Sequence, residues 1–278
     1  MGLIGTVGSP VEGEERFWDR EAEVALMQDW LREGRHILLT AQRRMGKSSL
    51  MREVARRLGG EFLCLEVDLQ SYQSPADVIA ALAARTRDHD LWQKVKGAFG
   101  SAFLKFIDGV ERVKLKDLEL QLRASMSGDE WQRRGNALLE VLSDQPRRVV
   151  LFLDEVPILV NRLLKDENDT IRPEGRAQAD LFLSWLRAAA PRHDGKILMV
   201  ITGSIRLEPI VHRAGLSASI NHLAPFDLLP WNRETALGAW TPWLYTTALR
   251  SRTGRARRCW SGWAFTCPIM CRPSSTGR

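Results

Sequence analysis

The sequence predicts an α/β fold in which helices cover both faces of a parallel sheet. Short apolar segments typical of buried strands occur at 36–40, 62–69, 147–155 and 196–204, and a less regular one lies around 222–229. Segments with helical spacing of apolar residues separate these strands. Strands that alternate with helices form parallel sheets, which bind their ligands at the carboxyl ends of the strands. A chain of 278 residues is long enough for such a core.

The expected helices lie at 19–32, 49–58, 75–84, 129–142 and 176–190. Asp19 is the expected N-cap of the first helix, and Ser74 followed by Pro75 starts the third. Between 113 and 122 the leucines alternate with polar residues, which favours a short strand or hairpin insert. The charged stretch 165–175 is typical of an exposed loop.

The first predicted strand runs into the segment Gln42-Arg-Arg-Met-Gly-Lys-Ser48. A loop that wraps a polyphosphate presents successive backbone N–H groups and then opens a helix whose positive end faces the anion. Gly46 permits close approach, Lys47 can reach the β- and γ-phosphates, and Ser48 supplies a hydroxyl to Mg²⁺. The predicted nucleotide-binding residues are Ala41, Gln42, Arg43, Arg44, Met45, Gly46, Lys47, Ser48 and Ser49.

Ala41 occupies the place where this phosphate-loop pattern has its first glycine, so a residue with a Cβ must make the entry turn. The alternative is an ordinary helix start, at which the serines satisfy backbone N–H groups. A buried strand before the segment and an amphipathic helix after it favour the phosphate loop.

Two carboxylates follow the apolar run 150–153, at the carboxyl end of a predicted strand. Buried carboxylates are costly unless a cation lies near them, and Mg²⁺ is the expected partner. We therefore expect Asp154 to hold Mg²⁺ through water and Glu155 to orient the water that attacks the γ-phosphate. Thr202, Gly203 and Ser204 end the next strand, where hydroxyls can contact that phosphate or water, although small residues also start ordinary turns.

Two further segments carry a family resemblance: Phe17-Trp-Asp-Arg-Glu-Ala-Glu23, upstream of the predicted phosphate loop, and the strand end Ile201-Thr-Gly-Ser204. Together with the motifs above, they make the chain resemble the archaeal-type and STAND-related AAA+ ATPases of prokaryotes. The similarity extends to Orc/Cdc6-like proteins and covers residues from about 15 to about 238. It implies a three-layer αβα P-loop NTPase domain with a five-stranded sheet in the order 5-1-4-3-2, and ATP as the nucleotide. It also implies a helical lid after the fifth strand and places Ser204 at the sensor position. No arginine finger in trans is assigned.

Residues 239–278 depart from this pattern, which separates an ATPase domain at 1–238 from an atypical tail. From Thr235 onward there are seven arginines and no Asp, Glu or Lys, so the charge of +6 comes from the tail and the body is near neutral. The tail has no helical period, and we expect that it is translated out of frame, because an alternative frame restores acids and leucines. A genuine basic tail that binds nucleic acid is the rival. The gene's nucleotide sequence around the Leu237 codon decides between them.

These observations predict a cytoplasmic ATPase that binds ATP and Mg²⁺ and uses the nucleotide state to switch a conformation or a partner. Lys47, Glu155 and Ser204 are the expected catalytic residues, and Ser48 and Asp154 the expected metal ligands. The segment Met1 to Pro10 lacks the features of a secretory signal, and no membrane segment is expected. A protein partner or homo-oligomer is possible. Two alternatives stay open: a DNA-binding initiator or transposition helper with ATP as a structural ligand, and a small-acceptor phosphotransferase.

Overall fold

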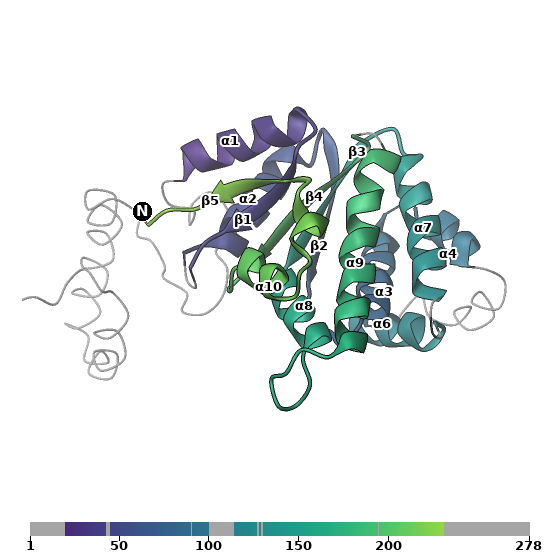
Figure 1. Ribbon diagram of the computed structural model, residues 1–278. Coiled ribbons are helices and arrows are strands. Elements are labelled where there is room, and N and C mark those ends of the chain that lie inside the picture. Colours follow the sequence, from purple (N-terminus) through teal and green to yellow (C-terminus); the bar gives the residue numbers. More distant parts are fainter. Residues whose placement is uncertain are drawn as a thin grey trace, which may run out of the picture. The chain divides into compact units, whose positions relative to one another are not determined.

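A five-stranded parallel sheet forms the centre of the computed structural model, which describes residues 20–42, 45–89, 91–99, 114–126, 128, 130–193 and 195–230. The strand order is β2-β3-β4-β1-β5, which confirms the predicted order 5-1-4-3-2 read from the opposite edge (Figure 1). The strands are β1 (His36–Thr40), β2 (Phe62–Asp68), β3 (Arg148–Asp154), β4 (Ile197–Gly203) and β5 (Leu223–Asp227). Each of the five strands predicted for the sheet is therefore present, with ends that differ by at most two residues.

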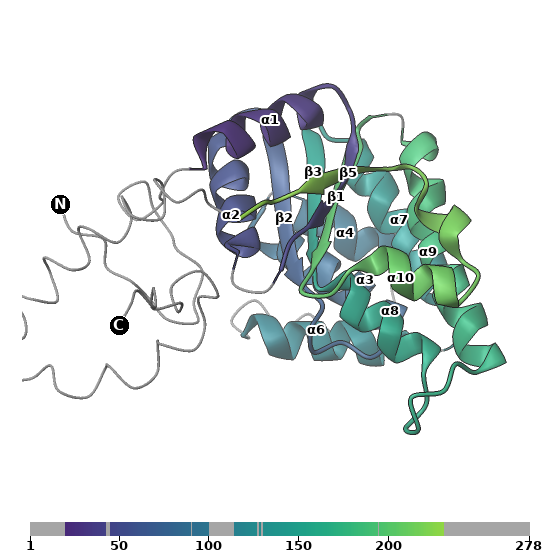
Figure 2. The same ribbon diagram turned by 60° about the vertical axis from the view of Figure 1, so that its left-hand side comes forward.

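Helices connect the strands and cover both faces of the sheet (Figures 1 and 2). One large core contains buried side chains of three strands and of the helices that follow each of them. The strand residues in this core include Leu65 of β2, Leu151 of β3 and Met199 of β4. Because side chains alternate along a strand, the residues between them face α1 and α2. The helices are α1 (Glu21–Arg32), α2 (Lys47–Leu58), α3 (Pro75–Arg85), α4 (Trp92–Phe99), α6 (Leu115–Ala124), α7 (Glu130–Ser143), α8 (Val156–Leu164), α9 (Pro173–Arg192) and α10 (Leu207–Arg213), with short 3₁₀ turns η1 (Thr86–Asp88) and η2 (Ser217–Ile220).

The expected strand or hairpin at 113–122 was wrong for the described residues from 114 onward, because α6 occupies this part of the chain. Leu118 and Leu122 are buried on one side of the helix, whereas Leu120 is 69% exposed. A leucine at every second position resembles strand alternation, but the four-residue spacing of the buried pair is helical. The exposed Leu120 produced the misleading pattern.

Other differences concern where helices begin. The N-cap position of α1 is Arg20, which makes no side-chain capping bond, rather than the expected Asp19. Helix α2 already begins at Lys47, and α9 begins at Pro173, inside the stretch expected to be a loop. Helices α4, α8 and α10 were not predicted. They are short, and short helices contain too few turns for a clear period.

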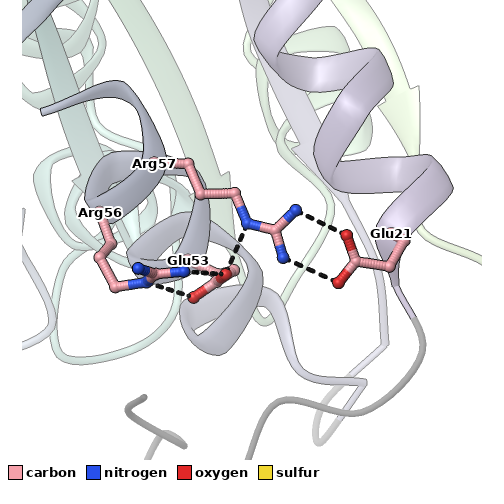
Figure 3. Close-up of polar contacts among 4 residues, drawn as sticks. All are labelled: Glu21, Glu53, Arg56 and Arg57. Carbon is pink, nitrogen blue, oxygen red and sulfur yellow. Dashed lines mark hydrogen bonds and ion pairs between the residues drawn. The ribbon is translucent and has the colours of Figure 1, made fainter. Parts of the chain in front are cut away.

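The helix that follows the expected phosphate loop, α2, is joined to α1 by a network of ion pairs (Figure 3). The Arg57 guanidinium donates two hydrogen bonds to Glu21, at 2.6 and 2.7 Å, and its Nε donates to Glu53 at 2.6 Å. Arg56 donates two further bonds to Glu53. The Glu53 side chain is only 4% exposed, whereas that of Glu21 is 65% exposed. The buried carboxylate is thus the centre of the network.

Glu53→Gln is expected to lower the free energy of unfolding by about 2 kcal/mol, because a buried acceptor of charged hydrogen bonds loses its charge. Hydrogen bonds from Arg56, and then Arg57, hold the pKa of Glu53 below its ordinary value. Its stabilisation is therefore present above the pKa of the unfolded chain, about 4.3, and is lost as the pH falls through the folded-state value. Denaturant unfolding at several pH values measures both effects.

The matched control is Glu21→Gln, which removes an exposed partner of the same arginine and should cost less than about 1 kcal/mol. Equal losses in the two variants, or a loss for Glu53→Gln that does not shrink at acidic pH, would contradict this account.

Phe17, Trp18, the loop arginines Arg43 and Arg44, and the tail at 239–278 lie outside the described residues. The compact unit at Arg20–Pro230 falls within the expected ATPase domain at 1–238.

Candidate functional site

The predicted site residues that the structure describes gather at the carboxyl edge of the sheet. Strands β3 and β4 are neighbours, and β1 pairs with β4 on the other side. In register, Leu39 pairs with Thr202 and Thr40 with Gly203, so the entry to the phosphate loop lies beside the end of β4. Parallel strands deliver their following loops to one edge, which explains why segments more than one hundred residues apart in the chain meet here.

The expected phosphate loop ends at Gly46, which has φ +86° and is the N-cap residue of α2. This left-handed conformation favours glycine, since a side chain would be strained there. The first turn of a helix directs its backbone N–H groups out of the helix end, where they can bind an anion. Apart from glycines, the described residues with positive φ are Glu155 and Asp169. Ala41 therefore makes the entry turn without the conformation that would demand glycine.

Lys47 begins α2 and is 7% exposed. Its Nζ donates hydrogen bonds to the carbonyl oxygens of Ala41 and Gln42, both at 3.3 Å. The ammonium group thus lies against the same loop that a polyphosphate would occupy. A cation on a flexible stem can turn from carbonyl oxygens to phosphate oxygens, which are stronger acceptors because they are charged.

Ser48 and Asp154, the two expected metal ligands, are in direct contact. The Ser48 Oγ donates to Asp154 Oδ2 at 2.8 Å, across 106 positions of the chain. Burial raises the pKa of Asp154, and the nearby Glu155 and Asp68 carboxylates act in the same direction, while the bond from Ser48 opposes them. A hydroxyl and a carboxylate that is costly to bury form an oxygen donor set, which suits Mg²⁺.

Asp68 is a further acidic residue at this edge that the sequence analysis missed. It ends β2 and is the register partner of Asp154 on β3. Its Oδ1 accepts a hydrogen bond from the Gln70 N–H at 2.9 Å, so part of its role is to form the following turn. The signal was present in the sequence, since β2, like β3, places an aspartate directly after apolar strand residues.

Glu155 and Ser204 lie together on adjacent strand ends. The Ser204 N–H and Oγ both donate to Glu155 Oε2, at 2.8 and 3.0 Å. Glu155 has φ 60° and ψ 28°, an unusual conformation for a residue with a side chain, and its N–H donates to Asp154 Oδ1 at 2.9 Å. The two bonds from Ser204 hold the Glu155 carboxylate, and the third bond holds its backbone in this conformation despite the backbone cost.

Gly203 allows this close approach of β4 to the start of α8. A Cβ added at Gly203 would meet Pro157 Cδ at 2.5 Å and Glu155 Oε2 at 3.4 Å. Any larger residue would displace the turn that carries Glu155, so the glycine is required by packing rather than by backbone freedom.

Within the described ranges, no group of three or more His, Cys, Asp or Glu side chains is arranged to hold a metal ion on its own. A metal at this edge would therefore depend on the nucleotide as well as on Ser48 and Asp154. The same part of the chain contains no helix with the length and apolar character needed to cross a membrane.

No family model and no curated protein matches the sequence. Among solved structures, the fold is similar to a Walker-type ATPase of Pyrococcus abyssi, with a TM-score of 0.48, 20% identity and coverage of 88% of this chain and 61% of the other. It is also similar to the Orc1 protein of Aeropyrum pernix in complex with DNA, with a TM-score of 0.47, 17% identity and coverage of 87% and 57%.

A third likeness is to the Drosophila ORC structure bound to AT-rich DNA and Cdc6, with a TM-score of 0.41, 15% identity and coverage of 78% of this chain and 61% of that one. The chain thus spans less than two thirds of the length of each of these proteins. These three likenesses concern the fold alone.

Proposed function

We propose that this chain binds ATP with Mg²⁺, hydrolyses it slowly and uses the nucleotide state as a conformational switch. The observation that carries the proposal is the direct bond between Ser48, in the first turn of α2, and Asp154 at the end of β3. The N-terminus of α2 and the Asp154 carboxylate would then face the same bound nucleotide and metal, and Lys47 lies beside them.

The residues fit their proposed ligands by their chemistry. The N-terminus of α2 and Lys47 supply positive charge for the phosphates. Ser48 and Asp154 would hold Mg²⁺, Ser48 by its hydroxyl and Asp154 through water. The bound metal would supply neutralisation of charge on the phosphate oxygens.

Glu155 is proposed to orient the water that attacks the γ-phosphorus and to accept its proton. The water oxygen forms a bond to phosphorus, the bond to the bridging oxygen breaks, and ADP and phosphate are released. Ser204 now donates both of its hydrogen bonds to Glu155 Oε2. This pairing keeps the carboxylate near the strand ends and limits its freedom, which supports slow rather than rapid turnover.

Asp154→Asn tests the proposed metal site. The amide keeps the shape of the carboxylate but loses its charge, so the gain in ATP affinity on adding Mg²⁺ should fall by about tenfold or more. Titration calorimetry of the full chain with ATP, in Mg²⁺ and in EDTA, measures that gain. The control is Asp180→Asn on α9, an aspartate that also accepts a serine hydroxyl, from Ser184 at 3.3 Å. If Mg²⁺ enhanced binding equally in wild type and Asp154→Asn, Asp154 would not hold the metal.

Two of the similar structures, those of Aeropyrum pernix Orc1 and Drosophila ORC, are complexes with DNA. For this chain, DNA binding and assembly with a protein partner are secondary proposals. Salt-dependent DNA binding by residues 1–238 would support an initiator or transposition helper, whereas binding that requires the tail would not.

A further inference from the structure

The edge strand β5 has one strand partner in the described sheet, β1. The paired segments are 36–40 and 223–227, and the Leu228 N–H adds a bond to the Thr40 carbonyl oxygen at 2.9 Å. A short strand at the edge of a sheet can open locally while the remaining strands stay paired. The contacts between β5 and β1 therefore decide whether this edge is closed.

Two histidine rings meet where β1 and β5 begin. His36 is the first residue of β1, and His222 directly precedes β5. Their ring centroids are 5.7 Å apart, and the ring planes are inclined by 63°. Nδ1 of His36 and both ring nitrogens of His222 are buried and have no hydrogen-bond partner among the described residues. Such burial costs a neutral imidazole far less than an imidazolium, which needs acceptors or a counter-charge.

The groups that face His222 offer no negative charge. His36 faces it from β1, and Arg187 faces it from α9, where the guanidinium also donates to the Ala218 carbonyl of η2 at 3.0 Å. Neither η2 nor β4, the other strand partner of β1, contains a titratable side chain. On β5 itself, Asp227 lies at the opposite end of the strand. A proton on His222 would therefore lie beside cationic groups alone.

The surroundings of His36 are no better suited to a charge. The carboxylate of Glu33, at the end of α1, is paired with Arg35 at 2.7 Å. Burial lowers the pKa of His36, and burial, followed by His36 and Arg187, lowers the pKa of His222 to about 4. Because these pKa values are depressed in the closed edge, its stability is fully present above the pKa of an exposed histidine, about 6.5, and is lost as the pH falls toward the closed-state value.

We propose that protonation of the His36–His222 pair detaches β5 from β1, so that the pair acts as a pH-sensitive switch at the edge of the sheet. The imidazole takes up a proton from solvent, and the backbone bonds between β5 and β1 break while the other four strands stay paired. Opening releases Thr40, the last residue of β1, from the Leu228 N–H, next to the start of the expected phosphate loop. The switch does not depend on nucleotide binding, so its failure would leave the proposed function untouched.

Hydrogen exchange of the full chain at pH 7.5 and pH 5, corrected for the intrinsic exchange rate at each pH, tests the switch. Amides of 223–228 report on β5, and amides of 149–153 report on β3 inside the sheet. Protection of β5 should fall by about thirtyfold at pH 5, the change that His222 alone produces with a pKa of about 6.5 when open and about 4 when closed. At pH 5, β5 should also be at least about tenfold less protected than β3, because the opening is confined to the edge.

A variant with both His36→Phe and His222→Phe keeps two rings but cannot be protonated there. Its β5 protection should agree at the two pH values within about threefold. His193→Phe is the matched control, because His193 is also buried, at 7% exposed, and its Nε2 has no partner among the described residues. Burial lowers the pKa of His193 as well, but this residue follows α9 and precedes β4. His193→Phe should therefore keep the response of β5.

Any of four results would overturn the switch. They are unchanged β5 protection in the wild-type chain at pH 5, equal protection of β5 and β3 at pH 5, a response that survives in the double variant, and a response lost in His193→Phe. Should the double variant not fold, His222→Phe alone must show a smaller response than the wild-type chain, and an undiminished response contradicts the assignment.

Discussion

Lys47→Met is expected to weaken ATP binding by roughly tenfold to a hundredfold. The substitution keeps most of the stem of Lys47 but removes the ammonium group, which now bonds the carbonyl oxygens of Ala41 and Gln42. On binding, this group would exchange neutral carbonyl oxygens for charged phosphate oxygens, and the second contact is the stronger one. Titration calorimetry with ATP and Mg²⁺ measures the effect.

The chain offers a closely matched control in Lys96. This lysine of α4 is also buried, at 8% exposed, and its Nζ lies over the ring of Trp92 at 5.8 Å from the centroid. Lys96→Met should therefore alter stability but not ATP affinity. Equal losses of affinity in both variants would indicate a general effect of removing a buried lysine rather than a phosphate contact.

Glu155→Gln is expected to lower ATP turnover by about 10²- to 10⁴-fold, because glutamine cannot accept a proton from the attacking water. ATP affinity should stay within about threefold of the wild-type value, since a contact used mainly in the transition state contributes little to substrate binding. Phosphate release under saturating ATP measures turnover, and calorimetry measures affinity.

Glu66→Gln is the control for that change. Glu66 lies on the neighbouring strand β2, before the Asp68 that ends it, and pairs with Arg52 of α2 at 3.8 Å. Its substitution should leave turnover near the wild-type value. A kcat for the wild-type chain that is indistinguishable from that of Glu155→Gln would show that Glu155 does not act in hydrolysis.

The sheet could be predicted because its strands carry strong and unbroken apolar runs. The run from Val149 to Leu153 is buried on both faces, and so is the whole of β4. Such runs stand out in a sequence whatever the surrounding contacts are. Residues 115–124 were harder, because one exposed leucine, Leu120, imitated strand alternation on the surface of a helix.

The pairing of Ser48 with Asp154 was within reach of the sequence, because each residue follows a recognisable strand and each suits a metal. The pairing of Ser204 with Glu155 was not predicted. It depends on the register between β3 and β4 and on the close packing of Gly203 against Pro157. A single sequence does not reveal register between strands that are distant along the chain.

The different surroundings of Thr202 and Ser204 show the same limit. From the sequence, both hydroxyls simply end a strand. In the structure, the Ser204 hydroxyl donates to Glu155, whereas the fully buried Thr202 hydroxyl has no hydrogen-bond partner among the described residues.

The most direct test of the central claim is a calorimetric titration of the wild-type chain with ATP in Mg²⁺, set beside Lys47→Met. The proposed site predicts saturable binding of one ATP per chain with a micromolar Kd, which corresponds to a binding free energy on the order of −8 kcal/mol. It also predicts a marked loss of ATP affinity in Lys47→Met. No saturable binding by the wild-type chain, or equal binding by both proteins, would contradict the account.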